Sequence, residues 1–454
     1  MKTFLDWSAF ENAGMGDAYA DIPKHGGNFA KAVAVCINSR HCETKDKGVM
    51  CPSFRISENP LLSTGGRVRL LKAALNSESP ESALNAVQLA EAMDLCVSCK
   101  GCKRECENEV DMAMIKIEYL AQRHARMGVP LRTRLFADLP QLLHQFTWLK
   151  KLIAWRNQSI WLMKLAHKLL GISAKRTLPL PADKPFFAHA NGKSFTPRAT
   201  TTDADKAVVL FVDTFTQNFE PGNAHAAIAV LEAGGYQVVI AEAEDTDKSP
   251  LCCGRTLLAH GLVDKAKRKA MRVLKALHPY VEAGLPIIGL EPSCLLAIRD
   301  DYRFLGLGEM AERVAMNAVL FEEFIAKEQA AKRLNLDLKP LPDNSNTTLV
   351  HGHCHQKAVG AMKSMRKVLK LIPDFEFDLI ESSCCGMAGS FGLEAEHVES
   401  SLAMAEQSLL PSIRQRPGAS IIANGFSCRH QIREYTGRQP AHIATLLQRA
   451  LSST

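Results

Sequence analysis

The sequence predicts an α+β protein with a helical N-terminal module and a duplicated α/β domain in its C-terminal half. Two observations support this fold class. The cysteines up to Cys106 lie among segments whose apolar residues recur at helical spacing, whereas the second half alternates short apolar runs with amphipathic segments, twice over. A chain of 454 residues, 46% of them hydrophobic and 23% charged, has the composition of a soluble globular protein with several domains.

Charge and cysteine content narrow the class of protein. The formal charge of +7 comes from 55 basic and 48 acidic residues without a long block of one sign, so we expect no nucleic-acid partner. Asp6 interrupts the N-terminal segment early, and no stretch approaches the roughly eighteen apolar residues that cross a bilayer. We therefore expect a cytoplasmic protein. Thiols stay reduced there, so its 14 cysteines indicate metal ligation rather than disulfides.

The first element is a helical module over residues 1–130, and its main signal is a run of four cysteines between helical segments within residues 80–127. The spacing is C-x2-C-x2-C-x3-C. Three thiolates at this spacing bind three irons of one four-iron cluster, and the fourth binds the other cluster of a two-cluster ferredoxin. Zinc is less favoured, because zinc sites normally use two CxxC pairs set well apart. The run consists of Cys96, Cys99, Cys102 and Cys106.

An earlier group of cysteines completes this module. It has the register of the same ferredoxin run, except that Ser39 replaces the second cysteine and the gap before Cys51-Pro52 is longer. By the crossover rule, Cys51 completes one [4Fe–4S] cluster with Cys96, Cys99 and Cys102. The second cluster is left with three thiolates, as a [3Fe–4S] cluster or as a [4Fe–4S] cluster with a further ligand such as His41 or Ser39. His41 can equally be a solvated loop residue. The three thiolates are those of Cys36, Cys42 and Cys106.

The middle segment, residues 131–200, is predicted to contain helices and a linker. Apolar residues at helical spacing over 131–171 include Trp148, Trp155 and Trp161, with Lys and Arg between them. We expect a pair of amphipathic helices packed on the neighbouring domain. The alternative is a helix that docks on a membrane surface or a partner. Proline and polar residues over 177–205 indicate the linker.

The C-terminal half is predicted to be two α/β repeats, residues 201–340 and 341–454. Buried parallel strands are expected where short apolar runs begin at Ala207, Gln237, Pro286, Thr348 and Ser420. Each repeat carries a Cys-Cys-Gly sequence and a later Ser-Cys after a strand. The two halves therefore form one pseudo-symmetric domain whose ligands gather at the carboxyl edge of each sheet.

The second repeat offers the fuller set of metal ligands, namely Cys354, Cys384, Cys385 and Cys428, with His351, His353, His355 and His430 nearby. This set suits an iron–sulfur cluster or another transition metal. The first repeat offers only Cys252, Cys253 and Cys294, with Thr216 near the place of Cys354. Alternatively, the paired cysteines are small buried residues beside a tight glycine turn. The sequence has neither a glycine-rich nucleotide motif nor a hydrolase elbow.

Several ordered motifs resemble one known family over nearly the whole chain. They include Gly-Val-Met-Cys-Pro (48–52), the 91–106 cysteine segment, Leu-Cys-Cys-Gly-Arg (251–255), Ser-Cys-Cys-Gly-Met (383–387) and Asn-Gly-Phe-Ser-Cys (424–428). The chain resembles the iron–sulfur portion of FAD-linked D-2-hydroxyacid dehydrogenases, which oxidise D-lactate or D-2-hydroxyglutarate. Its second half is similar to the cysteine-rich CCG domains of the glycolate oxidase iron–sulfur subunit, the anaerobic glycerol-3-phosphate dehydrogenase C subunit and heterodisulfide reductase. Ser39 and Glu107 depart from the usual cysteine and proline.

The resemblance implies an electron-transfer subunit or fragment. FAD would lie on a partner subunit or domain, and electrons would pass from reduced flavin through the clusters to a quinone or other acceptor. Peripheral attachment to the cytoplasmic membrane is compatible with this role. The main alternative is a heterodisulfide-reductase-like subunit that reduces thiol–disulfide pairs, and a third reading is a scaffold whose clusters are structural.

Overall fold

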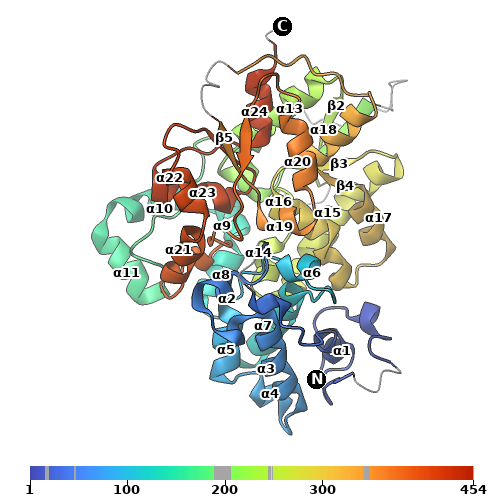
Figure 1. Cartoon of the computed structure of the whole chain (residues 1–454), viewed down its shortest axis with the longest axis vertical. Coiled ribbons are helices and arrows are strands. Elements are labelled where there is room, and N and C mark those ends of the chain that lie inside the picture. Colours follow the sequence, from blue (N-terminus) through green and yellow to red (C-terminus); the bar gives the residue numbers. More distant parts are fainter. Residues whose placement is uncertain are drawn as a thin grey trace.

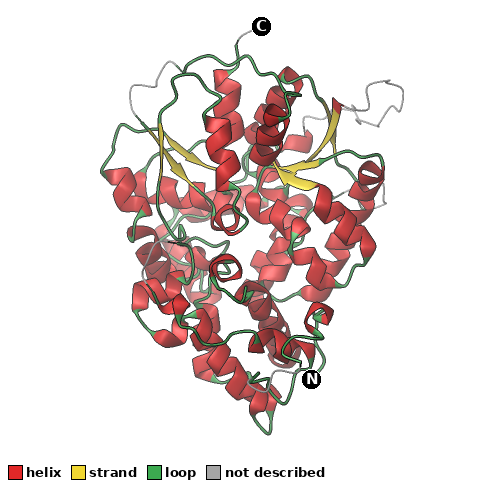
Figure 2. Ribbon diagram, turned by 45° about the vertical axis from the view of Figure 1, so that its right-hand side comes forward, coloured by secondary structure: helices red, strands yellow, loops and turns green. Residues whose placement is uncertain are grey.

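The computed structural model describes residues 1–15, 20–44, 48–188, 206–243, 247, 249–341 and 347–452. The helical N-terminal module lies at one end of the long axis, and the two small sheets lie toward the other (Figure 1). Helices fill the space between these sheets (Figure 2). Residues 189–205, most of the predicted linker, fall outside the described residues.

The N-terminal module is helical, as predicted, because its helices have strong start signals. Pro52 lies in the first turn of α2, Ser63 accepts a hydrogen bond from Gly66 N at the start of α3, and Asp111 accepts one from Met114 N at the start of α7. The helices are η1 (Ser8–Phe10), α1 (Asn28–Ala34), η2 (His41–Glu43), α2 (Pro52–Ser57), η3 (Pro60–Leu62), α3 (Thr64–Asn76), α4 (Pro80–Ala83), α5 (Val87–Asp94), α6 (Gly101–Glu105) and α7 (Met112–Met127).

The middle segment has four helices rather than the predicted pair: α8 (Leu131–Ala137), α9 (Leu139–Gln145), α10 (Leu149–Gln158) and α11 (Ile160–Leu170). The apolar periodicity is interrupted where Pro140 opens α9 and Ser159 caps α11. The helices are only partly packed against the rest of the protein. Ile153 is buried, but Trp148, Trp155 and Trp161 are 56%, 61% and 67% exposed.

Two parallel sheets form the C-terminal half. The first has the order β2-β1-β3-β4 and the second β6-β5-β7. All five predicted strands are confirmed, whereas β4 and β6 were not predicted. β6 contains the exposed Asp378 and lacks an apolar run, whereas β4 is a short Ala-Val-Leu run directly between α17 and α18. The strands are β1 (Ala207–Phe211), β2 (Gln237–Ile240), β3 (Ile287–Gly289), β4 (Ala318–Leu320), β5 (Thr348–His351), β6 (Phe377–Leu379) and β7 (Ile421–Ala423).

Helices cover both sheets. Around the first sheet lie η4 (Phe186–Ala188), α12 (Thr214–Asn218), α13 (Gly222–Ala233), α14 (Arg255–Ala259), α15 (Val263–Glu282), α16 (Pro292–Arg299), η6 (Asp301–Leu305), α17 (Glu309–Asn317) and α18 (Phe321–Ala330). Around the second lie α19 (Cys354–Ala358), α20 (Met362–Leu369), η7 (Phe391–Leu393), α21 (Val398–Glu406), α22 (Leu409–Arg414), α23 (Phe426–Thr436) and α24 (Ile443–Ala450).

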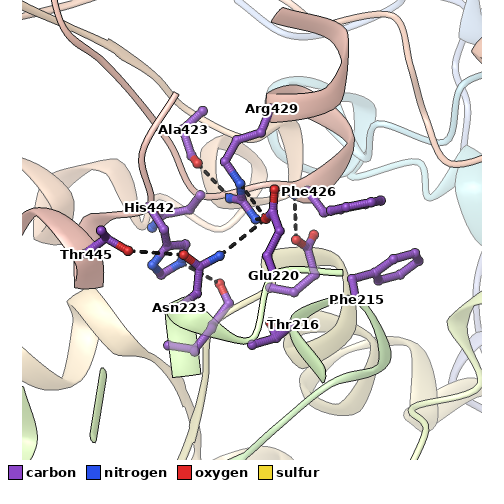
Figure 3. Close-up of polar contacts among 12 residues, drawn as sticks. Phe215, Thr216, Glu220, Asn223, Ala423, Phe426, Arg429, His442 and Thr445 are labelled. Atoms are coloured by element: carbon purple, nitrogen blue, oxygen red, sulfur yellow. Dashed lines mark hydrogen bonds and ion pairs between the residues drawn. The ribbon is translucent and has the colours of Figure 1, made fainter. Parts of the chain in front are cut away.

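Buried polar contacts join the two sheets (Figure 3). Arg429 of α23 donates from Nε to Glu220 over 2.8 Å, and Arg433 pairs with the same carboxylate. The backbone N–H of Phe426 donates to Glu291 over 2.7 Å. Because Arg429 is only 4% exposed, removing its partner would leave a buried charge unpaired. The contact between Phe426 and Glu291 joins the segment after β7 to the segment after β3.

Candidate iron–sulfur and metal centres

The first candidate centre is a small cavity lined by Cys51, Cys96, Cys99 and Cys102, the four cysteines predicted to share a cluster. The loops reach this arrangement through left-handed backbone at Cys51, Ser98 and Lys100, with φ of 52°, 49° and 58°. Gly101 permits the two loops to touch, since a Cβ there would lie 2.8 Å from Met50 N. The structure thus brings together residues 45 or more positions apart in the sequence.

This cavity has the chemistry that an iron–sulfur cluster requires. The backbone N–H of Thr64 donates to Cys51 Sγ over 3.1 Å, and the Thr64 hydroxyl lies 3.0 Å from the same sulfur. Such hydrogen bonds to sulfur help to set cluster potentials. Burial raises the pKa of the Cys99 thiol and raises that of Cys102 to about 12. A bound cluster would displace the protons of these thiols, because its ligands are thiolates.

The second group, Cys36, Cys42 and Cys106, lies beside the first. Burial raises the pKa of Cys36, and the negative charges of Cys42 and Cys106 raise it further, which shows that the three sulfurs share one region. Gly65 N donates to Cys42 Sγ over 3.2 Å. The first turn of α3 therefore serves both groups, through Thr64 and Gly65. Ser39 and His41 are exposed on the loop between Cys36 and Cys42.

A third set of cysteines gathers at the carboxyl edge of the second sheet. The Sγ atoms of Cys385 and Cys428 and a ring nitrogen of His351 lie within 4.8 Å of one another, and all three residues are buried. A hydrogen bond between the Cys354 and Cys384 thiols lowers the pKa of Cys354 to about 6. Gly386 permits the tight turn after the cysteine pair, at a φ of 81°, where a Cβ would lie 2.0 Å from Ser401 O.

His351 is the site residue that sequence reasoning named only as a neighbour. Its Nδ1 lies 2.9 Å from the Ser382 hydroxyl, while its buried Nε2 has no hydrogen bond within the described residues. An oriented imidazole with one free nitrogen beside two thiols is suited to metal ligation. Its place as the last residue of β5 was the available signal, because ligands of parallel sheets gather at strand ends.

The other histidines differ in their placement. His353 caps α19, since its Nδ1 accepts from His355 N over 3.2 Å. A Cβ on Gly425 would lie 2.4 Å from the His353 ring and 3.2 Å from Cys428 Sγ, so the ring adjoins that thiol. His430 instead pairs with Glu434 at 3.3 Å. Sequence position alone does not separate these roles.

In the first repeat, Cys253 forms thiol hydrogen bonds with both Cys252 and Cys294, so these three cysteines also meet. Thr216, expected near the place of Cys354, lies two residues after the helix position that corresponds to Cys354. Thr214 is the first residue of α12, as Cys354 is of α19, and Asp213 caps its helix as His353 does. Thr216 instead donates to Asp213 over 2.6 Å.

The cysteines of the second repeat pack directly on the four-cysteine cavity. Ser383, next to Cys384, donates to Val49 O over 2.7 Å, and His355 Nε2 lies 3.0 Å from Ser98 O. Cys99 and Cys384 share one buried apolar cluster, and Cys354 packs against it. Helices α6 and α19, far apart in sequence, accordingly lie side by side (Figure 1). All three candidate centres therefore form one continuous region.

Comparison with known domain families decides what this region is. Residues 35–111 match the 4Fe-4S dicluster domain, and residues 348–433 match the cysteine-rich domain. The chain thus carries one segment that matches an iron–sulfur dicluster domain and one that matches a cysteine-rich domain. The matches include both N-terminal cysteine groups and the cysteines of the second repeat, which confirms the resemblance seen in the sequence.

Relatives of this chain are dehydrogenases or a subunit of one. D-2-hydroxyglutarate dehydrogenase of Escherichia coli (strain K12) is 24% identical over 88% of the chain and 42% of the relative. The enzyme of that name from Pseudomonas putida is 24% identical over 93% of the chain and 44% of the relative. The C subunit of the anaerobic glycerol-3-phosphate dehydrogenase of E. coli (strain K12) is 28% identical over 54% of the chain and 59% of the relative. The chain thus spans less than half the length of the D-2-hydroxyglutarate dehydrogenases. Among the described residues, no helix has both the length and the apolar character needed to cross a membrane.

Proposed function

We propose that this chain is the electron-transfer component of a flavin-dependent D-2-hydroxyacid dehydrogenase. The observation that carries this proposal is the contact between the four-cysteine cavity and the cysteines of the second repeat, through Ser383 and Val49. Bound iron–sulfur clusters supply one-electron steps, which a reduced flavin requires when it delivers its two electrons separately. The protein's own part is to hold these centres close together, bury them and donate hydrogen bonds to their sulfurs.

The geometry supports the following ligand sets. One [4Fe–4S] cluster takes Cys51, Cys96, Cys99 and Cys102, which line one cavity. A second, three-thiolate cluster takes Cys36, Cys42 and Cys106. In the cysteine-rich domain, an iron–sulfur cluster or other metal takes Cys354, Cys384, Cys385 and Cys428, and we add His351 to this set. The first repeat, with Thr214 in place of a cysteine, is less suited to metal.

The domain organisation supports this assignment. We propose a dicluster module over 1–130, a helical segment and linker over 131–200, and two cysteine-rich repeats over 201–340 and 341–454. The strand orders β2-β1-β3 and β6-β5-β7 correspond, and the parallel bridge from Ile422 to Ala441 takes the place of β4. Strand β3 pairs with the central strand β1, and β7 pairs with the central strand β5. Cys294 follows β3 by the same number of residues as Cys428 follows β7, as a duplication requires.

The partner would carry FAD, since the dehydrogenase relatives are more than twice as long as the portion matched. We propose a quinone or another small molecule as the acceptor and a position in the cytoplasm or on the cytoplasmic face of the membrane. The exposed tryptophans of α10 and α11 support such an attachment, because tryptophan with interleaved lysine suits a membrane interface.

A thiol–disulfide reductase is the second candidate function, and one observation favours it. Cys354 is half-buried, while its neighbours Cys384, Cys385 and Cys428 are buried. A partly exposed thiol beside a metal centre can meet a disulfide substrate. Reduction of a disulfide by the pre-reduced chain alone would favour this function, whereas reduction of the chain by a flavoprotein without disulfide turnover would favour electron relay.

Anaerobic purification with iron and sulfide analysis and EPR tests the main proposal. We expect one four-iron centre, one three-thiolate centre, and a third signal that Cys385→Ser removes while leaving the others unchanged. A colourless protein with zinc, or without metal, at Cys96, Cys99 and Cys102 would contradict the electron-transfer role.

A further inference from the structure

A cleft of about 740 Å³ lies between the dicluster module and the second sheet. Its lining includes residues next to the cysteines of the dicluster module and next to those of the second repeat. Val49 lies two residues before Cys51, Glu105 directly precedes Cys106, and Ser382 and Ser383 lead into the Cys384-Cys385 pair. A molecule in this cleft would therefore lie beside the redox region.

The charge of the cleft is strongly unbalanced. Its lining includes five cationic side chains against the carboxylates of Glu105 and Glu381. Glu105 accepts the backbone N–H groups of Val49 and Met50, at 2.7 and 2.8 Å. The five cations are Arg55, Arg104, Lys357, Lys363 and Arg366.

Three of the cations are held in place by the fold. Arg55 Nε donates to Met50 O over 2.9 Å, and Lys357 Nζ donates to the Ser382 hydroxyl over 3.1 Å. Arg104 packs against Gly360, with Nη1 3.2 Å from where a Cβ would be. Cations positioned before a ligand arrives lose less entropy on binding it. Lys363 and Arg366, one turn apart on α20, are exposed.

Part of the remaining lining is apolar and includes Val49, Met362, Leu379 and Ile380, beside the polar Ser382, Ser383, Gln407 and Ser408. Cations that only balanced the cluster charge would not need an apolar cavity around them. Lys357 does interact with the thiolates of Cys354 and Cys384, but Lys363 and Arg366 lie exposed on a different helix. The cleft thus combines a cationic rim with an apolar surface, as binding sites for organic anions do.

We propose that this cleft binds a small organic dianion, a dicarboxylate or a phosphate monoester, beside the metal centre of the second repeat. The two negative charges, on two carboxylates or on one phosphate, would pair with cations such as Arg104 of the dicluster module and Arg366 of α20, while the carbon body covers the apolar residues. This site is additional to the electron relay and does not depend on it.

Calorimetry on the anaerobically purified, cluster-loaded chain tests the site. The probes are glutarate for the carboxylate class, phenyl phosphate for the phosphate class and glutaramide as a neutral counterpart. We expect one dianion to bind, glutaramide not to bind, and the double variant Lys363→Gln/Arg366→Gln to weaken binding at least about tenfold, since two charge-assisted contacts are lost. The charge-matched control Arg268→Gln/Lys275→Gln, at exposed positions of α15, should bind like the unsubstituted chain.

Three results would overturn the site. In the first, neither dianion binds at millimolar concentration. In the second, the cleft variant binds the dianion with the same affinity as the unsubstituted chain. In the third, the cleft variant loses affinity only for a flavoprotein partner. Iron content is measured in parallel. Normal iron with absent dianion binding rejects the cleft alone, whereas absent iron rejects the proposed electron-transfer function.

Discussion

The hydroxyl of Ser383 donates a 2.7 Å hydrogen bond to the carbonyl oxygen of Val49, 334 residues earlier in the chain. Ser383 directly precedes the Cys384-Cys385 pair, and Val49 lies two residues before Cys51. This single buried contact joins the loops of two candidate centres. Electron exchange between those centres depends on keeping them at a short and constant separation.

Ser383→Ala tests the strength of this link. The change leaves a buried carbonyl without its partner, so we expect the free energy of unfolding to fall by about 1–3 kcal/mol. Urea denaturation under anaerobic conditions measures it. Ser412→Ala on α22, which removes a half-buried hydroxyl, should change it far less. Equal effects of the two substitutions would show that the Val49 contact contributes nothing specific.

Cys51→Ser and Cys106→Ser test the crossover of ligands. The Cys51 variant should lose or convert only the four-iron centre, because Cys51 lines the cavity with Cys96, Cys99 and Cys102. The Cys106 variant should affect only the three-thiolate centre. EPR of the reduced and oxidised forms, with iron analysis, separates the two. If each variant altered the signal assigned to the other, the crossover would be wrong.

Much of this architecture was predictable because its signals are local. The spacing of the 96–106 cysteines determines which thiols can meet, and apolar runs identified the five longer or more apolar strands. Strand β6 has no such signal, since pairing with β5, and not its own composition, makes it a strand. In the middle segment, Pro140 and Ser159 divide a continuous periodicity into separate helices.

Long-range contacts were not predictable in this way. Buried Lys100, between Cys99 and Cys102, pairs with Asp111 at 3.5 Å and with Asp300 and Asp301 of the first repeat. No spacing rule connects these positions. The role of His351 depends on Ser382, which orients its ring, and the Thr214 equivalence depends on where a strand ends. Tertiary packing decides the partners of Lys100 and the orientation of the His351 ring.

His351→Ala tests the ligand that the structure adds. We expect the third EPR signal to disappear or change, because the free imidazole nitrogen lies within 4.8 Å of the Cys385 and Cys428 sulfurs. His430→Ala is the matched control, since His430 pairs with Glu434 instead. Its third signal should match that of the unsubstituted chain. An unchanged signal in the His351 variant would remove this residue from the ligand set.

His442 makes stability depend on pH. Burial lowers its pKa to about 3, from an ordinary value of 6.5. The neutral ring accepts from Ala444 N over 3.1 Å and lies 3.2 Å from Leu290 O, so it caps α24 and contacts the first repeat. The unfolded chain takes up a proton below pH 6.5 while the folded chain does not. This group's contribution to stability is therefore complete above pH 6.5 and is lost progressively as the pH falls toward 3.

At pH 5 the loss amounts to about 2 kcal/mol relative to pH 7. His442→Asn retains a capping oxygen but no longer titrates, so its urea midpoint should fall less between pH 7 and pH 5 than that of the unsubstituted chain. His278→Asn, on α15, provides the control because this half-exposed ring pairs only with Glu282 in the described structure. It should keep the full pH dependence. If the His442 variant also kept the full pH dependence, the acid sensitivity would have to arise from another group. The buried neutral imidazole would then not couple protonation to the contact between the two repeats.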